Sequence, residues 1–348
     1  MCHLISEMKN NQRIVWLDAI KGCGIILVMI SHVTPLENWG TYLFSSFMPL
    51  FFICSGFVAK DESIPVVLNK KLKSLLIPYW FYGIIATIFF SIVKTGNSYQ
   101  GGSVHEWWGL VYSRYCFYCY GHEYNLYFMP IESTSLLWFL TALFLGSILS
   151  VILLRKKVVS FWGTLFFYII FTLALSELPI LLPWSLDVAF LIAIFMLIGH
   201  LLRYFAFTEF IKRNNILIIL LVVAYIILTR INGYSNLSVR EYGKYGIYSI
   251  TLFFINGVLF FFLMAWVFIS MNGKLVSIFA LVGKHSLRLM CIHIPILFCI
   301  NKFSVKILKY EEKGITIICL IVISLIISIL LDRLFNRFRN KFPYLKYL

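Results

Sequence analysis

The sequence predicts an all-α, polytopic integral membrane protein with about ten transmembrane helices. Of its 348 residues, 61% are hydrophobic and 13% are charged, whereas soluble globular domains carry about 25% charged residues. The hydrophobic residues also gather in runs of roughly 20, the length that crosses a bilayer as a helix. No comparably long polar stretch separates these runs, so a single membrane domain over residues 1–348 is expected.

Ten apolar runs follow one another along the chain, and each is interpreted as one span. The seventh and ninth are shorter than the others, and the ends of such elements are the hardest features to place from sequence. The runs cover residues 14–33, 41–59, 74–93, 135–154, 158–175, 186–202, 215–229, 247–270, 287–300 and 315–331.

Basic residues are distributed unequally among the connections between these runs. With the N-terminus in the cytoplasm, 20 of the 30 Lys and Arg residues fall inside and nine fall outside. Cytoplasmic connections are rich in Lys and Arg, so both termini are predicted to lie inside. The same bias accounts for the net charge of +15, and nucleic acid is not an expected partner.

The first run carries three polar side chains, Asp18, Lys21 and His32. Ionisable residues inside a span are costly and usually mark a functional site. Lys21 and His32 are eleven positions apart, so they share nearly one helix face with about 16 Å of rise between them. Two plainer interpretations remain open: Asp18 and Lys21 form a structural ion pair, or His32 is an interfacial residue bonded to a loop.

Three further segments stand out. Residues 47–57 read Phe-Met-Pro-Leu-Phe-Phe-Ile-Cys-Ser-Gly-Phe, residues 135–140 read Ser-Leu-Leu-Trp-Phe-Leu, and residues 283–295 read Gly-Lys-His-Ser-Leu-Arg-Leu-Met-Cys-Ile-His-Ile-Pro. Taken singly, the first is typical of close helix packing, and Trp138 in the second is typical of an interface anchor. In the third, His293 lies well inside a span, where Pro295 leaves a backbone carbonyl for it to bind.

Together, in this order, the four segments resemble membrane acyltransferase family 3, particularly its fucose 4-O-acetylase and exopolysaccharide O-acetyltransferase branch. In that family a basic residue and a histidine with ten residues between them mark the first helix. Lys21 and His32 fill this frame, and lysine at the first position is common in the fucose-type branch.

The resemblance implies an acyl-CoA-dependent O-acetyltransferase of the bacterial inner (plasma) membrane. It would transfer acetyl from cytoplasmic acetyl-CoA to a hydroxyl of a cell-surface or lipid-linked glycan, with His32 as general base or as nucleophile. The implied partners are acetyl-CoA, a carbohydrate acceptor and the lipid bilayer; no metal is expected, and the oligomeric state, a homo-oligomer included, stays open. The implied catalytic residues are His32, Asp18 and Lys21, and the implied cofactor-binding residues are Lys21, Trp138, Ser286 and His293.

Two sets of connecting residues are weaker candidates. Basic residues at 70, 71, 73 and 155–157 would suit the phosphates of acetyl-CoA, although positive-inside bias explains them as well. The long outside connection, residues 94–134, carries Trp107 and Trp108 among many aromatic residues, which suit sugar stacking or a membrane-lying loop. Its Cys116 and Cys119 form a lone CxxC, which is not enough for a zinc site.

Two other classes of function compete with the enzyme. A transporter or flippase for a glycan intermediate or small solute would also place charges within its spans. However, the chain shows no internal repeat, which many transporters have. A non-catalytic scaffold of a polysaccharide assembly is the third interpretation. Only the enzyme would label an acceptor with acetyl from acetyl-CoA in detergent.

Overall fold

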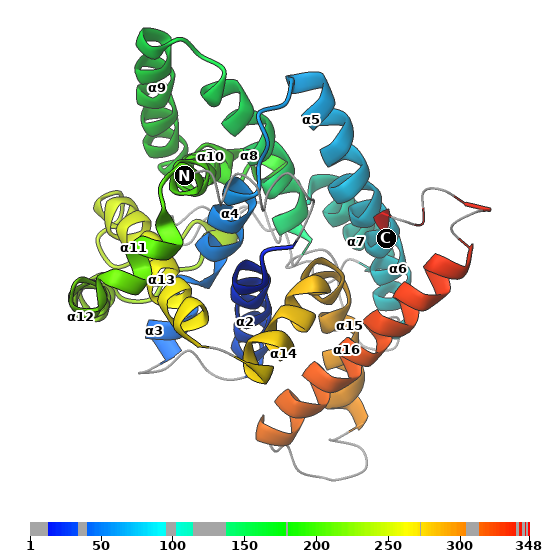
Figure 1. Ribbon diagram of the computed structural model, residues 1–348. Helices are drawn as coiled ribbons and strands as arrows, with labels where there is room; N and C mark the ends of the chain where they lie inside the picture. The colour runs from blue at the N-terminus through cyan, green and yellow to red at the C-terminus, as the bar shows by residue number, and fades with distance from the viewer. Residues whose placement is uncertain are drawn as a thin grey trace. The chain divides into compact units, whose positions relative to one another are not determined.

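The protein is described by a computed structural model (Figure 1). The described residues are 13–33, 40–94, 102–113, 137–178, 180–271, 273–303, 313–338, 341–342, 345 and 347–348.

Helices make up most of the described part of the chain, and an isolated bridge between Asn236 and Glu241 is its only β feature. The all-α prediction is therefore confirmed. The helices are α2 (Val15–Ser31), α3 (Gly40–Phe44), α4 (Phe47–Phe57), α5 (Ile64–Lys71), a π-helical turn (Leu72–Leu76), α6 (Ile77–Lys94), α7 (Gly102–Tyr112), α8 (Trp138–Leu154), α9 (Val158–Ser176), a 3₁₀ turn (Pro183–Ser185), α10 (Leu186–Tyr204), α11 (Phe207–Arg213), α12 (Asn215–Asn232), a 3₁₀ turn (Leu237–Val239), α13 (Tyr248–Ser270), α14 (Lys274–Lys284), α15 (Ser286–Phe303) and α16 (Lys313–Phe338).

Among the described residues, seven helical stretches are long and apolar enough to cross a membrane. The chain is therefore a multi-pass membrane protein. The expected count of about ten spans is not confirmed, because α2 and α8 have 17 residues each and α4 has 11. The seven are Ile64–Val93, Val159–Ser176, Pro183–Tyr204, Asn215–Asn232, Tyr248–Ser270, Ser286–Phe303 and Lys313–Phe338.

The second apolar run is not one helix. It is divided at Ser45 and Ser46 into α3 and α4. An 11-residue helix such as α4 rises only about 16 Å, roughly half of the hydrocarbon core. The third apolar run, in contrast, is part of a longer helix. Helix α5, the π-helical turn and α6 continue without a break from Ile64 to Lys94.

The described residues of the chain form two compact units. The first consists of residues 1–60, 195–235 and 242–286. In it, α2 packs against α4, α13 and α14. Aromatic rings fill this core: Trp16 lies 5.4 Å from Phe57 between ring centres.

The second unit consists of residues 61–194, 236–241 and 287–348. In it, α6 packs against α7, and α8 packs against α5 and α9. Polar contacts tie its later helices together, since Arg288 of α15 donates to the backbone oxygen of Ser328 at 2.9 Å and contacts Asp332 of α16 at 3.2 Å.

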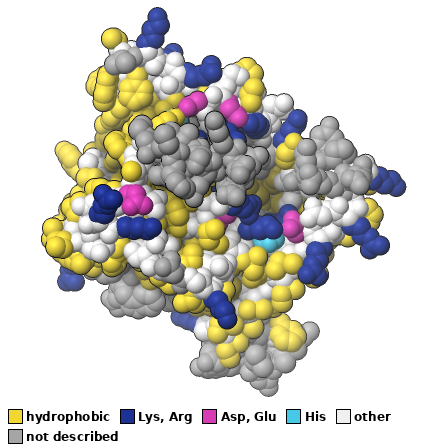
Figure 2. Space-filling view, in the orientation of Figure 1, with side chains coloured by type: hydrophobic (Ala, Val, Ile, Leu, Met, Phe, Trp, Pro, Cys, Tyr) yellow, Lys and Arg dark blue, Asp and Glu magenta, His cyan; other side chains and the backbone are white. Residues whose placement is uncertain are grey.

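Large apolar side chains cover much of the outside of these helices. Figure 2 shows hydrophobic side chains over much of one face, and the exposed ones include Val159, Trp162, Ile216 and Leu220 of α9 and α12. Extended exposed apolar surface is costly in water, so these faces are suited to lipid.

Candidate active site

The candidate site is built on α2 in the first unit. Asp18 lies in the first turn of this helix, where a negative charge is favoured by the helix dipole. Lys21 follows one turn later, and His32 caps the C-terminal end. The three predicted residues of the opening segment therefore lie along one helix and its cap.

Two glycines allow α2 and α14 to pack closely together. A Cβ atom added to Gly22 would lie 1.9 Å from the backbone oxygen of Phe279, and one added to Gly283 would lie 1.8 Å from the backbone oxygen of Asp18. Figure 1 shows the two helices side by side. The first and fourth sequence segments thus meet through glycine, as small residues allow in membrane helix packing.

Asp18 and Lys21 form an ion pair. The Lys21 ammonium lies 3.5 Å from one Asp18 oxygen, and the Arg13 guanidinium lies 3.8 Å from the other. The side chains of Lys21 and Asp18 are 22% and 15% exposed. The Asp18–Lys21 ion pair, one of the interpretations left open by the sequence, is therefore present, but it is long and still accessible.

The second sequence segment faces this pair. Cys54 of α4 is buried and lies within electrostatic range of both Lys21 and Asp18. Phe51, one turn earlier, lies so close to Gly24 of α2 that an added Cβ would be 3.0 Å from its ring. Segments one, two and four thus meet around α2.

His32 lies at the opposite end of α2 from the ion pair. It is the first residue after the helix, and it is exposed. Eleven positions of helix place it about 16 Å along the axis from Lys21 and on nearly the same face. A reactant that uses both groups must therefore extend along the helix.

The remaining predicted residues belong to other helices. Ser286 begins α15 and is the last residue of the first unit. Trp138 and His293 belong to the second unit, where both are buried. His293 places Nδ1 2.9 Å from the oxygen of Leu289, one turn earlier in its own helix. This carbonyl differs from the one that Pro295 leaves without its helical donor, which belongs to Cys291.

The long connection over residues 94–134 contains α7, a helix that was not predicted from the sequence. Trp107 and Trp108 lie on α7 and are exposed. Tyr112, at the end of α7, donates a 2.6 Å hydrogen bond to the carbonyl of Leu181. The CxxC cysteines, Cys116 and Cys119, lie outside the described residues, and so do the aromatic residues at 114–136.

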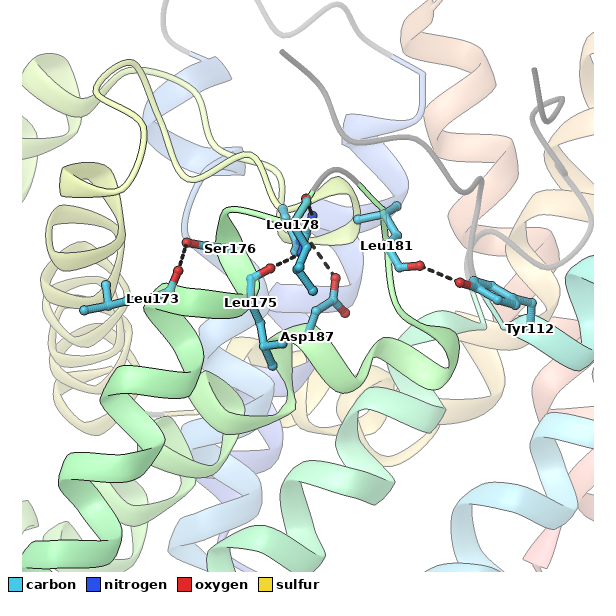
Figure 3. A network of polar contacts seen from close by, with 8 residues as sticks. Tyr112, Leu173, Leu175, Ser176, Leu178, Leu181 and Asp187 are labelled. Carbon is cyan, nitrogen blue, oxygen red and sulfur yellow. Dashed lines mark hydrogen bonds and ion pairs between the residues drawn. The ribbon is translucent and has the colours of Figure 1, made fainter. Parts of the chain in front are cut away.

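The second unit contains a buried ion pair that was not predicted from the sequence. Arg240 lies 3.2 Å from Asp187, and their side chains are 1% and 0% exposed. Arg240 also donates to the carbonyls of Leu175 and Leu178 at the end of α9 (Figure 3). The sequence signal was Asp187, an acid at the start of an apolar run, but its partner is distant in sequence. The pair joins segment 236–241 to α9 and α10.

The described part of the chain contains no cluster of side chains suited to binding a metal ion. No three His, Cys, Asp or Glu side chains there lie close enough together to hold an ion.

The fold and the site define a multi-pass membrane protein with an accessible ion pair inside one tightly packed apolar helix. The family model of the acyltransferase domain matches residues 14–333, nearly the whole chain. The chain therefore belongs to acyltransferase family 3 and is a membrane acyltransferase. Comparisons with curated proteins and with solved structures give no significant match.

Proposed function

We propose that this acyltransferase transfers an acetyl group from acetyl-CoA to a hydroxyl group of a cell-surface or lipid-linked glycan. The observation that carries the proposal is the arrangement on α2, where Lys21 and Asp18 stand near one end and the exposed His32 stands at the other. The rise of about 16 Å between them is comparable to the length of the pantetheine arm. One donor molecule can therefore reach both ends.

Lys21 is the proposed anchor for an anionic part of the donor. Its ion pair with Asp18 is 3.5 Å long and partly exposed, so exchanging it for a phosphate oxygen costs little buried contact. Asp18, which Arg13 also approaches, orients the ammonium when no donor is bound. This role explains an acid and an amine one turn apart in an apolar helix.

His32 is the proposed catalytic residue. As general base, its imidazole takes the proton of the acceptor hydroxyl while the oxygen attacks the thioester carbonyl and the thiolate of coenzyme A leaves. As nucleophile, it would first accept the acetyl group and then pass it to the hydroxyl. Both routes give the acetyl ester and free coenzyme A, so trapping an acetylated enzyme without acceptor distinguishes them.

The proposed orientation follows the charge distribution. With the N-terminus in the cytoplasm, the Lys21 end of α2 faces the cytoplasm, where acetyl-CoA is made, and His32 faces the outside. The site would then join an inner donor to an outer acceptor, in a bacterial inner membrane.

The function is tested by direct transfer. Purified protein in detergent, given labelled acetyl-CoA and glycan extracted from cells lacking the gene, is expected to place the label on the glycan. NMR spectra of the same glycan from cells with and without the gene should differ in O-acetyl signals. Unlabelled glycan and identical spectra would reject the proposal.

A further inference from the structure

A pocket of about 920 Å³ opens at the N-terminal end of α2. Its walls come from α2, α11, the end of α13 and the first two turns of α14, all in the first unit. Val15 and Trp16 contribute from α2, but Asp18 and Lys21 are not part of the lining. The pocket is therefore distinct from the candidate active site.

Most of the lining is apolar, and part of it is open to the surroundings. Trp16 and Phe268 form part of the wall. Val15, Ile278 and Leu281 line it while remaining 53%, 56% and 45% exposed. A wall of this kind suits a hydrocarbon chain more than a wholly polar molecule.

Two lysines supply the charge. Lys212 lies in the last turn of α11, and Lys274 is the first residue of α14. Neither forms an ion pair with a residue that the structure describes. A cation at a helix N-terminus is disfavoured by the helix dipole, so a bound anion would relieve this repulsion as well as pair with both lysines.

The start of α14 adds hydrogen-bond donors. Gly273 precedes the helix with φ at 97° and provides no side-chain cap. The first backbone N–H groups of the helix therefore have no acceptor from a capping side chain and can donate to a ligand. The hydroxyl-bearing residues Thr208 and Ser277 also line the pocket.

From these contacts we infer that the pocket binds an anionic phospholipid. The phosphate pairs with Lys212 and Lys274 at the start of α14, and an acyl chain lies along Val15, Ile278 and Leu281. The two helices that bear the lysines have 7 and 11 residues. They are too short to span the hydrocarbon core, which suits a position at the headgroup level.

The charge count favours a lipid over coenzyme A. Two lysines are enough to neutralise the single negative charge of a phosphodiester, whereas coenzyme A brings three phosphates and an adenine edge that needs several polar partners. The mainly apolar lining provides few such partners. The inference does not depend on the proposed acetyl transfer, because lipid binding is measured without any substrate.

The test uses the full-length protein in detergent, titrated with phosphatidylglycerol or phosphatidylcholine and followed by native mass spectrometry. The variant pair Lys212→Gln with Lys274→Gln should weaken phosphatidylglycerol binding roughly twentyfold, since each lysine near anionic lipid contributes about fivefold. The control, Arg333→Gln with Arg337→Gln, removes two exposed basic residues from α16 and should change binding less than about twofold.

A second variant tests the pocket without changing charge. Ser277→Trp places a large ring at an exposed position of the lining and should also abolish phosphatidylglycerol binding while the protein remains monodisperse. Three results would overturn the inference: equal binding of phosphatidylcholine, unchanged binding by both pocket variants, or displacement of bound phosphatidylglycerol by coenzyme A, which would assign the pocket to the acyl donor.

Discussion

Lys21 lies inside an apolar helix and forms an ion pair with Asp18, one turn before it. The pair is 3.5 Å long, and both side chains retain contact with the surroundings. A purely structural pair would gain from shorter contact and fuller burial, since long exposed pairs contribute little stability. The geometry is therefore better suited to a cation that exchanges partners than to one that holds the fold.

Replacement of Lys21 tests this role. Lys21→Ala should raise the KM for acetyl-CoA about tenfold or more, because a charge-assisted contact to the donor is lost, whereas Lys21→Arg should retain most of the affinity. Lys284→Ala, at an exposed position of α14, is the matched control. An unchanged KM in Lys21→Ala would remove Lys21 from the donor site.

Arg240, unlike Lys21, forms an ion pair that is fully buried. Its pair with Asp187 is buried, and its remaining donors bind carbonyls at the end of α9. Arg240→Met should therefore destabilise the folded protein by about 3 kcal/mol or more, because the Asp187 charge loses its partner in the interior. Thermal unfolding in detergent would measure this loss.

The comparison variant is Lys70→Met, which removes an ion pair with Glu62 whose lysine is 59% exposed. Exposed pairs are worth at most about 1 kcal/mol, so its unfolding temperature should stay close to that of the wild type. Equal effects of the two substitutions would show that Arg240 does not hold segment 236–241 in place.

At the scale of elements, the contact between α2 and α14 positions the site. Gly22 has no room for a side chain against Phe279. Gly22→Ala should therefore force the helices apart and cost about 1–3 kcal/mol, and it should reduce transfer because Asp18 and Lys21 shift with the backbone. Activity and unfolding temperature are measured together.

Gly163 of α9 provides the control, because nothing lies within 4 Å of an added Cβ there. Gly163→Ala should be neutral or slightly stabilising, since alanine is the better helix former. A Gly22→Ala protein as stable and active as Gly163→Ala would contradict the role given to the α2–α14 contact.

Most of the long helices could be predicted from the sequence, because a span requires only length and apolar character. The break between α3 and α4 could not, since Ser45 and Ser46 are tolerated in apolar runs and their conformation depends on neighbours. Ser45 accepts two hydrogen bonds from Ser235, which belongs to another part of the chain. Helix α7 was missed because the surrounding connection has no apolar run of spanning length.

In the candidate site, too, some features could be predicted from the sequence and others could not. The charges of Asp18 and Lys21 stand out in any apolar run, and their spacing alone predicts the ion pair. The approach of α14 through Gly22 and Gly283 depends on two distant segments meeting. The sequence motifs contain both glycines, but a single sequence does not say that they face each other.

At the scale of the whole molecule, the membrane orientation is open to test. A membrane-impermeant maleimide should label Tyr245→Cys in intact cells but Ser277→Cys only after lysis, because the charge distribution puts the first position outside and the second inside. The unsubstituted protein gives the background from its native cysteines. The reverse pattern would place His32 on the cytoplasmic side and remove the proposed path from donor to acceptor.

The most direct measurement is the rate of acetyl transfer by purified His32→Ala protein, compared with wild type and the Lys284→Ala control. If His32 acts on the acceptor hydroxyl or carries the acetyl group, kcat/KM should fall at least about a hundredfold, with no change in unfolding temperature. Full transfer by a folded His32→Ala protein would contradict the assignment of catalysis to α2.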